Sequence, residues 1–260
     1  MARASEGYVS QLSHLMAQSA GALVRSPSHS RRAEARRRLA RHALWLVASL
    51  SALIIVLMFA VDATEIGLMP KRGSPELWPV RIFTDFGKDD YVLWALAAIF
   101  VFGALVYPLT RSSGRPGLAR FAIRVEYLFL AVAVPVFVAE LIKWTVGRGR
   151  PFVGVGGKAD AFNFVPFTGT EAYFSFPSAH AVTAFALAFA VAAIWPRWWV
   201  AAFLYALLIG ASRLVLLAHH PSDVVGGALV GIVGAMAVRY WFAARRVGFD
   251  IKDDGKIVSL

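Results

Sequence analysis

Long apolar runs separated by polar segments are the main pattern along this chain of 260 residues. The runs occupy residues 43–62, 91–110, 122–146, 177–195, 198–217 and 222–243. Each holds about 20 residues, enough for a helix to cross the hydrocarbon core of a bilayer. The pattern predicts an all-α integral membrane protein built as a six-helix bundle.

The connections between these runs predict how the bundle is threaded. Only Pro196–Trp198 separate the fourth run from the fifth, which predicts a tight antiparallel pair, whereas residues 63–90 and 147–176 form long loops. Six crossings place both termini on one side. That side carries 18 lysines and arginines against seven in the two long loops. Positive charge marks the cytoplasmic side, so we expect cytoplasmic termini, with the long loops facing the periplasm of a bacterial inner membrane.

We divide the chain into a basic cytoplasmic N-terminal arm (1–42), a six-span domain (43–243) and a cytoplasmic C-terminal tail (244–260). The arm has eight arginines and no apolar region followed by a cleavage site, which argues against a cleavable secretory signal. Its composition also fits an organelle transit peptide. Residues 31–45 fit either a basic helix lying against acidic head groups or a solvated run of charge.

Composition excludes several classes of protein. With 58% hydrophobic and 17% charged residues and a mean hydropathy of +0.60, the chain is too apolar for an ordinary soluble domain. The net charge of +11 does not indicate nucleic-acid binding, because the arginines lie mainly in the arm and the short loops. There is no cysteine for a disulfide, a thiol nucleophile or a metal site. The sequence has no pair of Gly/Pro-broken helices in corresponding halves, which disfavours an inverted-repeat transporter. We interpret the glycines of the sixth run as packing residues.

The third run ends in KWTVGRGRP, residues 143–151. Gly147, Gly149 and Pro151 predict the end of a helix, with Lys143 on its last turn and Arg150 in a loop that can fold back. A lysine point charge and an arginine fork together suit a phosphate group. Cations at the end of a span can also be plain interfacial anchors.

The fourth run opens with FSFPSAH, residues 174–180. Pro177 and Ser178 are typical of a helix start, where free backbone amides point toward an anion. Without a ligand, the same residues fit a serine cap followed by an interfacial histidine, His180.

The third cluster is SRLVLLAHHPSD, residues 212–223, at the junction of the last two runs. On one continuous helix, Arg213 and His219 would point about 240° apart, so Pro221 predicts a break near this position. The order of the runs brings all three clusters to the outer end, where three cations could neutralise phosphate oxygens while one histidine attacks phosphorus and another protonates the leaving oxygen. The alternative for the two histidines, a metal site, lacks a further ligand, so we assign none.

The order Lys-x6-Arg-Pro, Pro-Ser-x-His and Ser-Arg-x5-His-x3-Asp resembles the type 2 phosphatidic acid phosphatase superfamily, which includes membrane lipid phosphatases and soluble vanadium haloperoxidases. The motifs run from Lys143 to Asp223, the six-span layout extends the likeness to residues 43–243, and the arm lies outside it.

The resemblance implies a metal-independent lipid phosphatase that needs no cofactor and works through a phosphohistidine. His219 matches the nucleophile, Asp223 the carboxylate that orients it, and His180 the general acid. The positions that match phosphate-binding residues are Lys143, Arg150, Ser178 and Arg213, with the backbone amide of Ala179. His220 misses the spacing by one residue. Ala179 replaces the usual glycine, which would cost roughly 1 kcal/mol if the position requires a positive φ.

The expected substrate is an amphiphile with a phosphate or diphosphate head, reached from the outer leaflet. Phosphatidic acid, phosphatidylglycerol phosphate, a polyprenyl diphosphate and a lipopolysaccharide anchor phosphate all remain open. Beyond substrate and membrane lipids, no nucleic acid or obligate protein partner is expected. A phosphotransferase using the same phosphohistidine is the main alternative. A transporter is less favoured because the runs are apolar in their middles.

Overall fold

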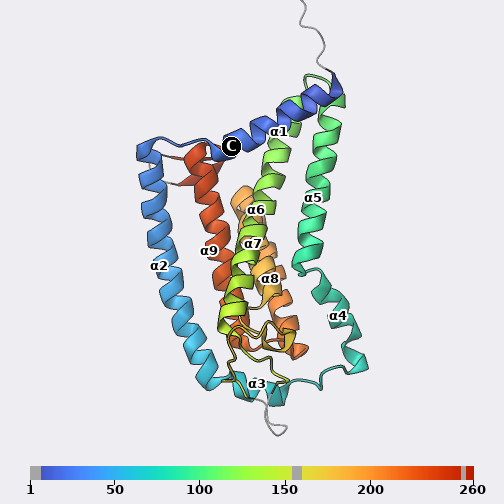
Figure 1. Ribbon diagram of the computed structural model, residues 1–260, viewed down its shortest axis with the longest axis vertical. Helices are drawn as coiled ribbons and strands as arrows, with labels where there is room; N and C mark the ends of the chain where they lie inside the picture. The colour runs from blue at the N-terminus through green and yellow to red at the C-terminus, as the bar shows by residue number, and fades with distance from the viewer. Residues whose placement is uncertain (1–6, 154–159, 253–255) are drawn as a thin grey trace, which may run out of the picture.

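A computed structural model describes residues 7–153, 160–252 and 256–260. Helices dominate the described chain, most of them aligned with the long axis of the molecule (Figure 1). The α-helices are α1 (Tyr8–Val24), α2 (His29–Ala60), α3 (Asp62–Leu68), α4 (Trp78–Asp85), α5 (Asp89–Val106), α6 (Arg115–Val146), α7 (Ala179–Ile194), α8 (Trp199–Val215) and α9 (Pro221–Arg245). Short 3-10 turns cover Pro75–Leu77, Tyr107–Leu109, Glu171–Tyr173 and Pro196–Trp198, and β1 (Phe249–Ile251) pairs antiparallel with β2 (Ile257–Ser259).

Each of the six apolar runs forms a helix, and the all-α prediction is confirmed. Within the described residues, five segments are long and apolar enough to cross a membrane. They are α2, the segment Pro75–Leu109 that contains α5, then α6, the segment Pro196–Val215 that contains α8, and α9. The fourth run forms α7, which has only 16 residues. At 1.5 Å per residue α7 is ~24 Å long, less than the ~30 Å hydrocarbon core. The sixth crossing and the cytoplasmic termini therefore stay predictions.

The core of the bundle forms where α7 packs against α6, α8 and α9. α7 is apolar all round and buries ten of its residues, including Val182 and Ala186. Glycines on α9 allow this approach: a Cβ on Gly231 would lie 2.5 Å from the Val182 carbonyl oxygen, and one on Gly234 would lie 2.5 Å from Pro135 Cβ. The interpretation of these glycines as packing residues is confirmed.

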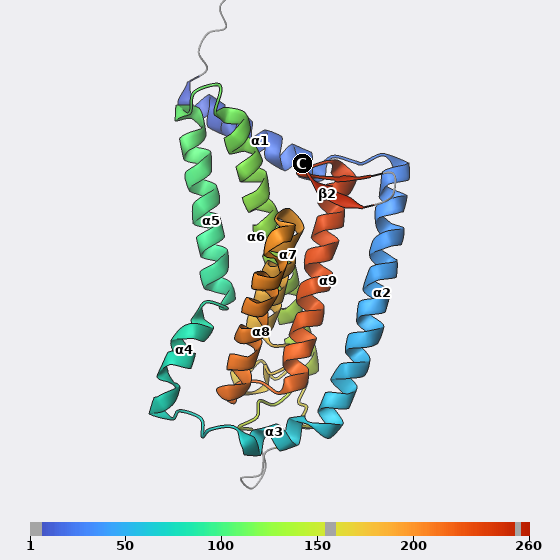
Figure 2. The same ribbon diagram turned by 180° about the vertical axis from the view of Figure 1, so that it is seen from behind.

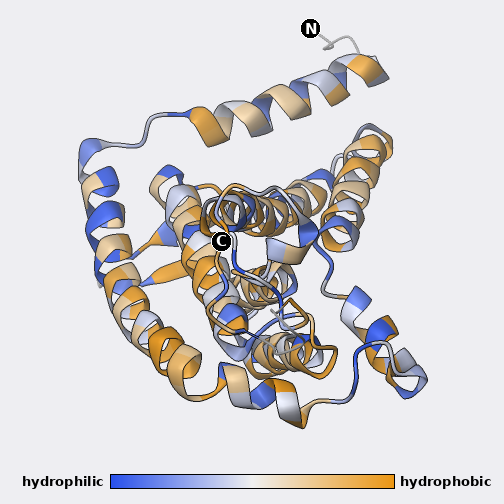
Figure 3. Cartoon of the chain, turned by 60° about the horizontal axis from the view of Figure 1, so that its bottom comes forward, coloured by the Kyte–Doolittle hydropathy of each residue, from blue (hydrophilic) through white to orange (hydrophobic). Residues whose placement is uncertain are grey.

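The N-terminal arm forms ordered helices. α1 lies across the end of the bundle where α2 begins and α9 ends (Figures 1 and 2). There the Tyr8 hydroxyl donates to the Leu105 carbonyl oxygen at 2.7 Å. α2 begins at His29, so the last part of the basic arm is the first part of this helix, and the helix changes from hydrophilic to hydrophobic along its length (Figure 3). Its only buried residues are Ala35 and Ile54.

The opposite end of the bundle brings together α3, the loop after α6, the start of α7 and the junction of α8 with α9 (Figure 1). α8 ends at Val215, Leu217 has a φ of 48°, and α9 begins at Pro221. The predicted break in the third cluster is thus present. It lets residues on both sides of it face a common site.

Candidate active site

One cavity of about 410 Å³ gathers residues from all three sequence clusters. Six of the eight predicted site residues line it: Lys143, Arg150, Ala179, His180, Arg213 and His219. The other two, Ser178 and Asp223, are fully buried. The end of α6, the loop after it, the start of α7, the end of α8 and the junction of α8 with α9 supply these residues.

The end of α6 places Lys143 and Arg150 on the same cavity. Gly147 closes the helix with a left-handed φ of 56°, and a Cβ there would lie 2.0 Å from the Val165 carbonyl oxygen, so only glycine fits. Lys143 Nζ pairs with Glu140 Oε1 at 2.5 Å. Arg150 donates to the Glu171 carbonyl oxygen at 2.9 Å and to its carboxylate at 3.1 Å. Both cations thus have carboxylate partners next to the cavity.

His219 has a defined tautomer. It is 3% exposed, and its Nδ1 lies 2.8 Å from the Ser175 carbonyl oxygen. A carbonyl oxygen only accepts, so Nδ1 carries the proton and Nε2 carries the lone pair. Burial lowers the pKa of His219 to about 4, although Asp223 opposes this shift, and the ring is neutral at pH 7. A neutral imidazole with a free Nε2 is the form that can attack phosphorus.

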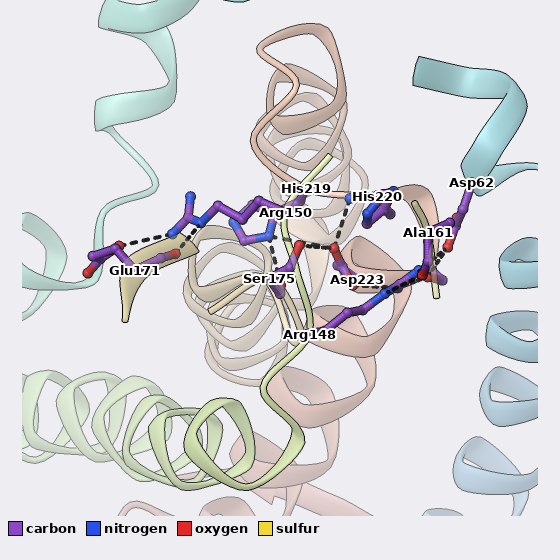
Figure 4. Close-up of polar contacts among 10 residues, drawn as sticks. Asp62, Arg148, Arg150, Ala161, Glu171, Ser175, His219, His220 and Asp223 are labelled. Carbon is purple, nitrogen blue, oxygen red and sulfur yellow. Dashed lines mark hydrogen bonds and ion pairs between the residues drawn. The ribbon is translucent and has the colours of Figure 1, made fainter. Parts of the chain in front are cut away.

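Asp223 lies beside His219 but does not take its hydrogen bond directly. The distance from Asp223 Oδ2 to His219 Nδ1 is 3.8 Å. The same oxygen accepts from the Ser175 hydroxyl at 2.5 Å and from the His220 backbone N–H at 2.8 Å (Figure 4). Ser175 therefore contacts both partners, with its hydroxyl on the carboxylate and its carbonyl on the imidazole.

Arg148 is the central residue that the sequence did not identify. It is 1% exposed and donates from Nη1 to Asp223 Oδ1 at 2.7 Å and from Nη2 to Asp62 Oδ2 at 2.8 Å (Figure 4). Asp62 is itself fully buried and also accepts from the Ser222 hydroxyl at 2.5 Å. A signal existed, because Arg148 lies inside the first cluster and Asp62 ends the first apolar run, but nothing in their spacing paired them.

The start of α7 explains why alanine is tolerated in the second cluster. Among the described residues, only Phe167, Leu217 and Arg246 are non-glycine positions with positive φ, so Ala179 carries no such strain. Ser178 occupies the N-cap position without a side-chain capping bond. Its hydroxyl and Nε2 of His180 have no hydrogen-bond partner within the described ranges, and a bound ligand could supply one.

Arg213 is held by a residue outside all three clusters. Its Nη1 donates to Thr84 Oγ1 of α4 at 3.0 Å, and the Ser212 hydroxyl lies 2.9 Å from the same oxygen. Three more charged residues of the α4–α5 region line the cavity, namely Lys88, Asp89 and Asp90. A neighbouring cavity of about 760 Å³ shares Arg150 and Arg213 and adds Arg72 and Arg81.

His220 differs from His219 in its position. It is fully buried at the N-cap of α9 and does not line the 410 Å³ cavity. The structure thus separates the two adjacent histidines, as their spacing suggested. In the part of the chain that the structure describes, no group of three or more His, Cys, Asp or Glu side chains has an arrangement that could hold a metal ion.

Comparison with known proteins identifies the family. Residues 124–246 match the PAP2 superfamily model. Lipid A 1-phosphatase of Rhizobium johnstonii is 32% identical over 205 residues, 78% of this chain and 82% of its own. The lipid A 1-phosphatase of Rhizobium etli is 30% identical over 195 residues, 68% of this chain and 82% of its own. Escherichia coli YbjG, provisionally named an undecaprenyl-diphosphatase, is 32% identical over 118 residues, 43% of this chain and 56% of its own.

No solved structure matches the chain. The family model covers the predicted site residues from Lys143 to Asp223, and Asp62 and Thr84 lie outside it. The resemblance drawn from the three clusters is therefore confirmed, and the chain belongs to the PAP2 superfamily and is a membrane lipid phosphatase.

Proposed function

We propose that the protein hydrolyses the phosphate head group of a lipid through a phosphohistidine formed on His219, without a metal ion. The observation that carries this proposal is the fixed tautomer of His219, whose neutral ring lines a cavity together with His180 and four cations, Lys88, Lys143, Arg150 and Arg213. Transfer through a phosphohistidine requires a nucleophile, an acid and charge-stabilising groups, and all of these border the same space.

In the proposed reaction, Nε2 of His219 attacks phosphorus and the bond from phosphorus to the lipid oxygen breaks. His180, in its imidazolium form with the anionic phosphate bound, gives a proton to that oxygen and becomes neutral, and the lipid product leaves. His180 then takes a proton from water as the water attacks the phosphohistidine, which releases inorganic phosphate and restores His219. Lys143, Arg150 and Arg213, with the Ser178 hydroxyl and the Ala179 amide, neutralise the phosphate oxygens in both steps.

The electrostatic role of Asp223 is to stabilise the positive charge that develops on His219 as it attacks. The carboxylate lies 3.8 Å from Nδ1, and Ser175 contacts both groups. A Coulomb interaction at this distance in a buried site is substantial, on the order of 4 kcal/mol at an effective dielectric constant of 20. Asp223 therefore does not need a direct hydrogen bond to contribute.

For the substrate, we propose a lipid with more than one anionic group, which the site meets from the outer leaflet. The relatives named lipid A 1-phosphatase support a phosphate of lipid A, and YbjG supports undecaprenyl diphosphate. The neighbouring cavity supports either choice, because Arg72 and Arg81 add two cations beyond the shared Arg150 and Arg213. The outward orientation rests on the distribution of lysine and arginine between the two sides.

The experiment is a phosphate-release assay on the purified protein in detergent, with excess chelator and no acceptor. The panel contains phosphatidic acid, phosphatidylglycerol phosphate, a polyprenyl diphosphate and a phosphorylated lipid A. We expect release from at least one of them and inhibition by vanadate, whose trigonal bipyramid mimics the transition state. Activity that requires a divalent ion would favour a metal mechanism, and release only when an acceptor is added would favour a phosphotransferase.

The adjacent histidines provide the matched pair of variants. We expect His219→Ala to lower kcat by about 10³-fold or more, since a missing nucleophile is not replaced. The ring of His220 is buried and does not line the cavity. In His220→Ala, kcat should therefore stay within about tenfold of the wild-type value, while the stability falls by roughly 2 kcal/mol. Reversed severity in the two variants would reject His219 as the nucleophile.

A further inference from the structure

A buried cation lies at the end of the molecule opposite the active site. Arg245, the last residue of α9, is 7% exposed, and its guanidinium stacks over the ring of Trp241 at 3.4 Å from the centroid. Its Nη1 donates to the Trp241 carbonyl oxygen at 3.3 Å, but its Nε is buried without a hydrogen-bond partner in the described residues. A buried charge that is incompletely paired is costly, which favours an anion beside it.

A cavity of about 460 Å³ adjoins this arginine, and we call it the α2–α9 cavity. Arg32 and Arg36 on α2 line it together with Arg245 on α9. Its other lining residues carry no charge: Pro27, Ala35, Leu39, Ala237, Tyr240, Trp241 and Ala244. Three cations and no carboxylate therefore border a single space, which suits a ligand with a negative charge.

The surroundings of the α2–α9 cavity match the head-group level of a bilayer. Here α2 changes from hydrophilic to hydrophobic (Figure 3), and beyond Leu39 it exposes Leu44 at 69% and Trp45 at 72%. Tyr240 and Trp241 are residue types enriched at membrane interfaces. A ligand whose charge lies among the arginines would have apolar helix surface next to it for its acyl chains. A phospholipid has both parts, whereas a soluble anion has only the first.

We propose that the α2–α9 cavity binds the head group of an anionic phospholipid from the leaflet on the side of the chain termini. The lipid phosphate joins Arg32 and Arg36 of α2 to Arg245 of α9. This linkage matters because Ala35 and Ile54 are the only buried residues of α2. Among the described polar contacts, the pair between His42 Nδ1 and the Tyr240 hydroxyl, at 2.9 Å, also joins these two helices. The lipid therefore stabilises the position of α2, independently of the reaction at the far end.

The test measures lipid binding to the purified, delipidated full chain in a nonionic detergent. Phosphatidylglycerol and phosphatidylcholine with identical acyl chains are titrated, with bound lipid counted by native mass spectrometry and Tm followed in parallel. We expect phosphatidylglycerol to bind more tightly and to raise Tm. The double variant Arg32→Gln/Arg36→Gln should weaken its binding about 10- to 30-fold, from two lost cation contacts at the membrane surface.

Two further variants separate a built site from diffuse charge. Arg31→Gln/Arg37→Gln removes the same charge from exposed positions of the same helix that do not line the cavity, and it should leave phosphatidylglycerol binding within about threefold of wild type. Arg32→Lys/Arg36→Lys keeps the charge and should retain most of the binding. Phosphate release from a short-chain substrate should be unchanged in all three, which also reports that each variant folds.

Several results would overturn the proposal. Equal loss of binding in the Arg31/Arg37 variant would show a non-specific electrostatic effect. Equal affinity for phosphatidylcholine would show that the head-group charge is not recognised. A Tm increase with glycerol 3-phosphate alone, as large as that with phosphatidylglycerol, would instead indicate a site for a soluble anion.

Discussion

At the scale of single residues, the contacts Asp62–Arg148–Asp223 link the first residue of α3 to the carboxylate that is proposed to orient His219. Arg148 bonds both aspartates at 2.7 and 2.8 Å, and all three side chains are at most 1% exposed. A guanidinium between two carboxylates fixes the orientation of each. In the proposed mechanism, Asp62 would act on His219 only through Arg148 and Asp223, as a positioning residue.

We expect Asp62→Asn to lower kcat about 10- to 100-fold with little change in KM, as the loss of outer partners of an active-site group does. The variant keeps the shape of the side chain but leaves Arg148 with one carboxylate. Steady-state kinetics on the best substrate of the panel checks this. Glu76→Gln, on an exposed position of the same connecting region, is the control. A KM increase at unchanged kcat would show that Asp62 serves binding instead.

Glu65 makes stability depend on pH. It is 5% exposed, both carboxylate oxygens lack a partner in the described residues, and burial with the nearby Asp62 and Asp223 raises its pKa to about 7 from 4.5. The folded state therefore binds a proton that the unfolded state releases between pH 4.5 and 7, so stability is lost as the pH rises through this window.

Glu65→Gln removes this ionisation. We expect the Tm of the variant, measured relative to the wild type, to rise by several degrees from pH 5 to pH 8. About 1 kcal/mol corresponds to roughly 2–4 °C in a chain of this size. Melting curves at both pH values check it, with Glu76→Gln as the control. Parallel wild-type and Glu65→Gln curves across this range would mean that Glu65 is ionised in the folded protein.

The residue scale also shows what the sequence could identify. Lys143, His180, Arg213 and His219 line one cavity because each belongs to a cluster with recognisable chemistry and spacing. Asp62 contacts Arg148 and Thr84 contacts Arg213, but both come from segments without such a pattern. Ser175 lies within the second cluster, where nothing in the spacing marked it as a partner of Asp223. Their roles follow from tertiary packing between distant segments, which periodicity and spacing do not encode.

At the scale of elements, the turn after α6 sets the position of Arg148 and Arg150. Gly147 and Gly169 provide a matched pair, with φ values of 56° and 67°. A Cβ on Gly147 would lie 2.0 Å from the Val165 carbonyl oxygen, whereas nothing lies within 4 Å of one on Gly169. An alanine at either position would carry the cost of a left-handed backbone, but only at Gly147 would its Cβ also clash with another residue.

We expect Gly169→Ala to lower the stability by roughly 1–2 kcal/mol, the cost of a left-handed backbone, and to keep full activity. Gly147→Ala should lose more stability, and kcat/KM should fall at least about tenfold because the loop that carries both arginines must move. Denaturation curves and kinetics of the two variants check this. Equal behaviour of the pair would show that the loop relaxes without disturbing the site.

The helices could be predicted from the sequence where long apolar runs or a proline determine their positions. All six helices of the apolar runs are present, and Pro221 begins α9 after the expected break. The sequence alone leaves residues 31–45 open between a basic helix and a solvated run of charge. They are helical, and α2 begins at His29, because arginine and alanine are good helix formers and continue the helix beyond its apolar part. The short α7 also departs from the 19-residue run predicted at 177–195, since Pro177 and Ser178 precede its first turn.

At the scale of the whole molecule, residues at the start of α2 and the end of α9 line the α2–α9 cavity, whereas the end of α6 and the start of α7 line the proposed active site. These parts of the helices lie at opposite ends of the bundle (Figure 1). The two ends differ in charge, since 18 lysines and arginines belong to the segments at the terminus side and seven to the two long loops. The cytoplasmic leaflet attracts such positive charge. The same asymmetry that predicts the sidedness of the site thus predicts which leaflet supplies the proposed structural lipid.

Sidedness can be measured directly because the chain has no cysteine. Thr168 and Ser113 are exposed in loops at the site end and the terminus end respectively. In intact spheroplasts, we expect Thr168→Cys to react with a membrane-impermeant maleimide and Ser113→Cys to react only after the membrane is opened. The reverse pattern would move the chemistry to the cytoplasmic leaflet. Labelling of both cysteines in sealed spheroplasts would place the two loops on the same side of the membrane. The helix between them, α6, would then not cross the membrane as predicted.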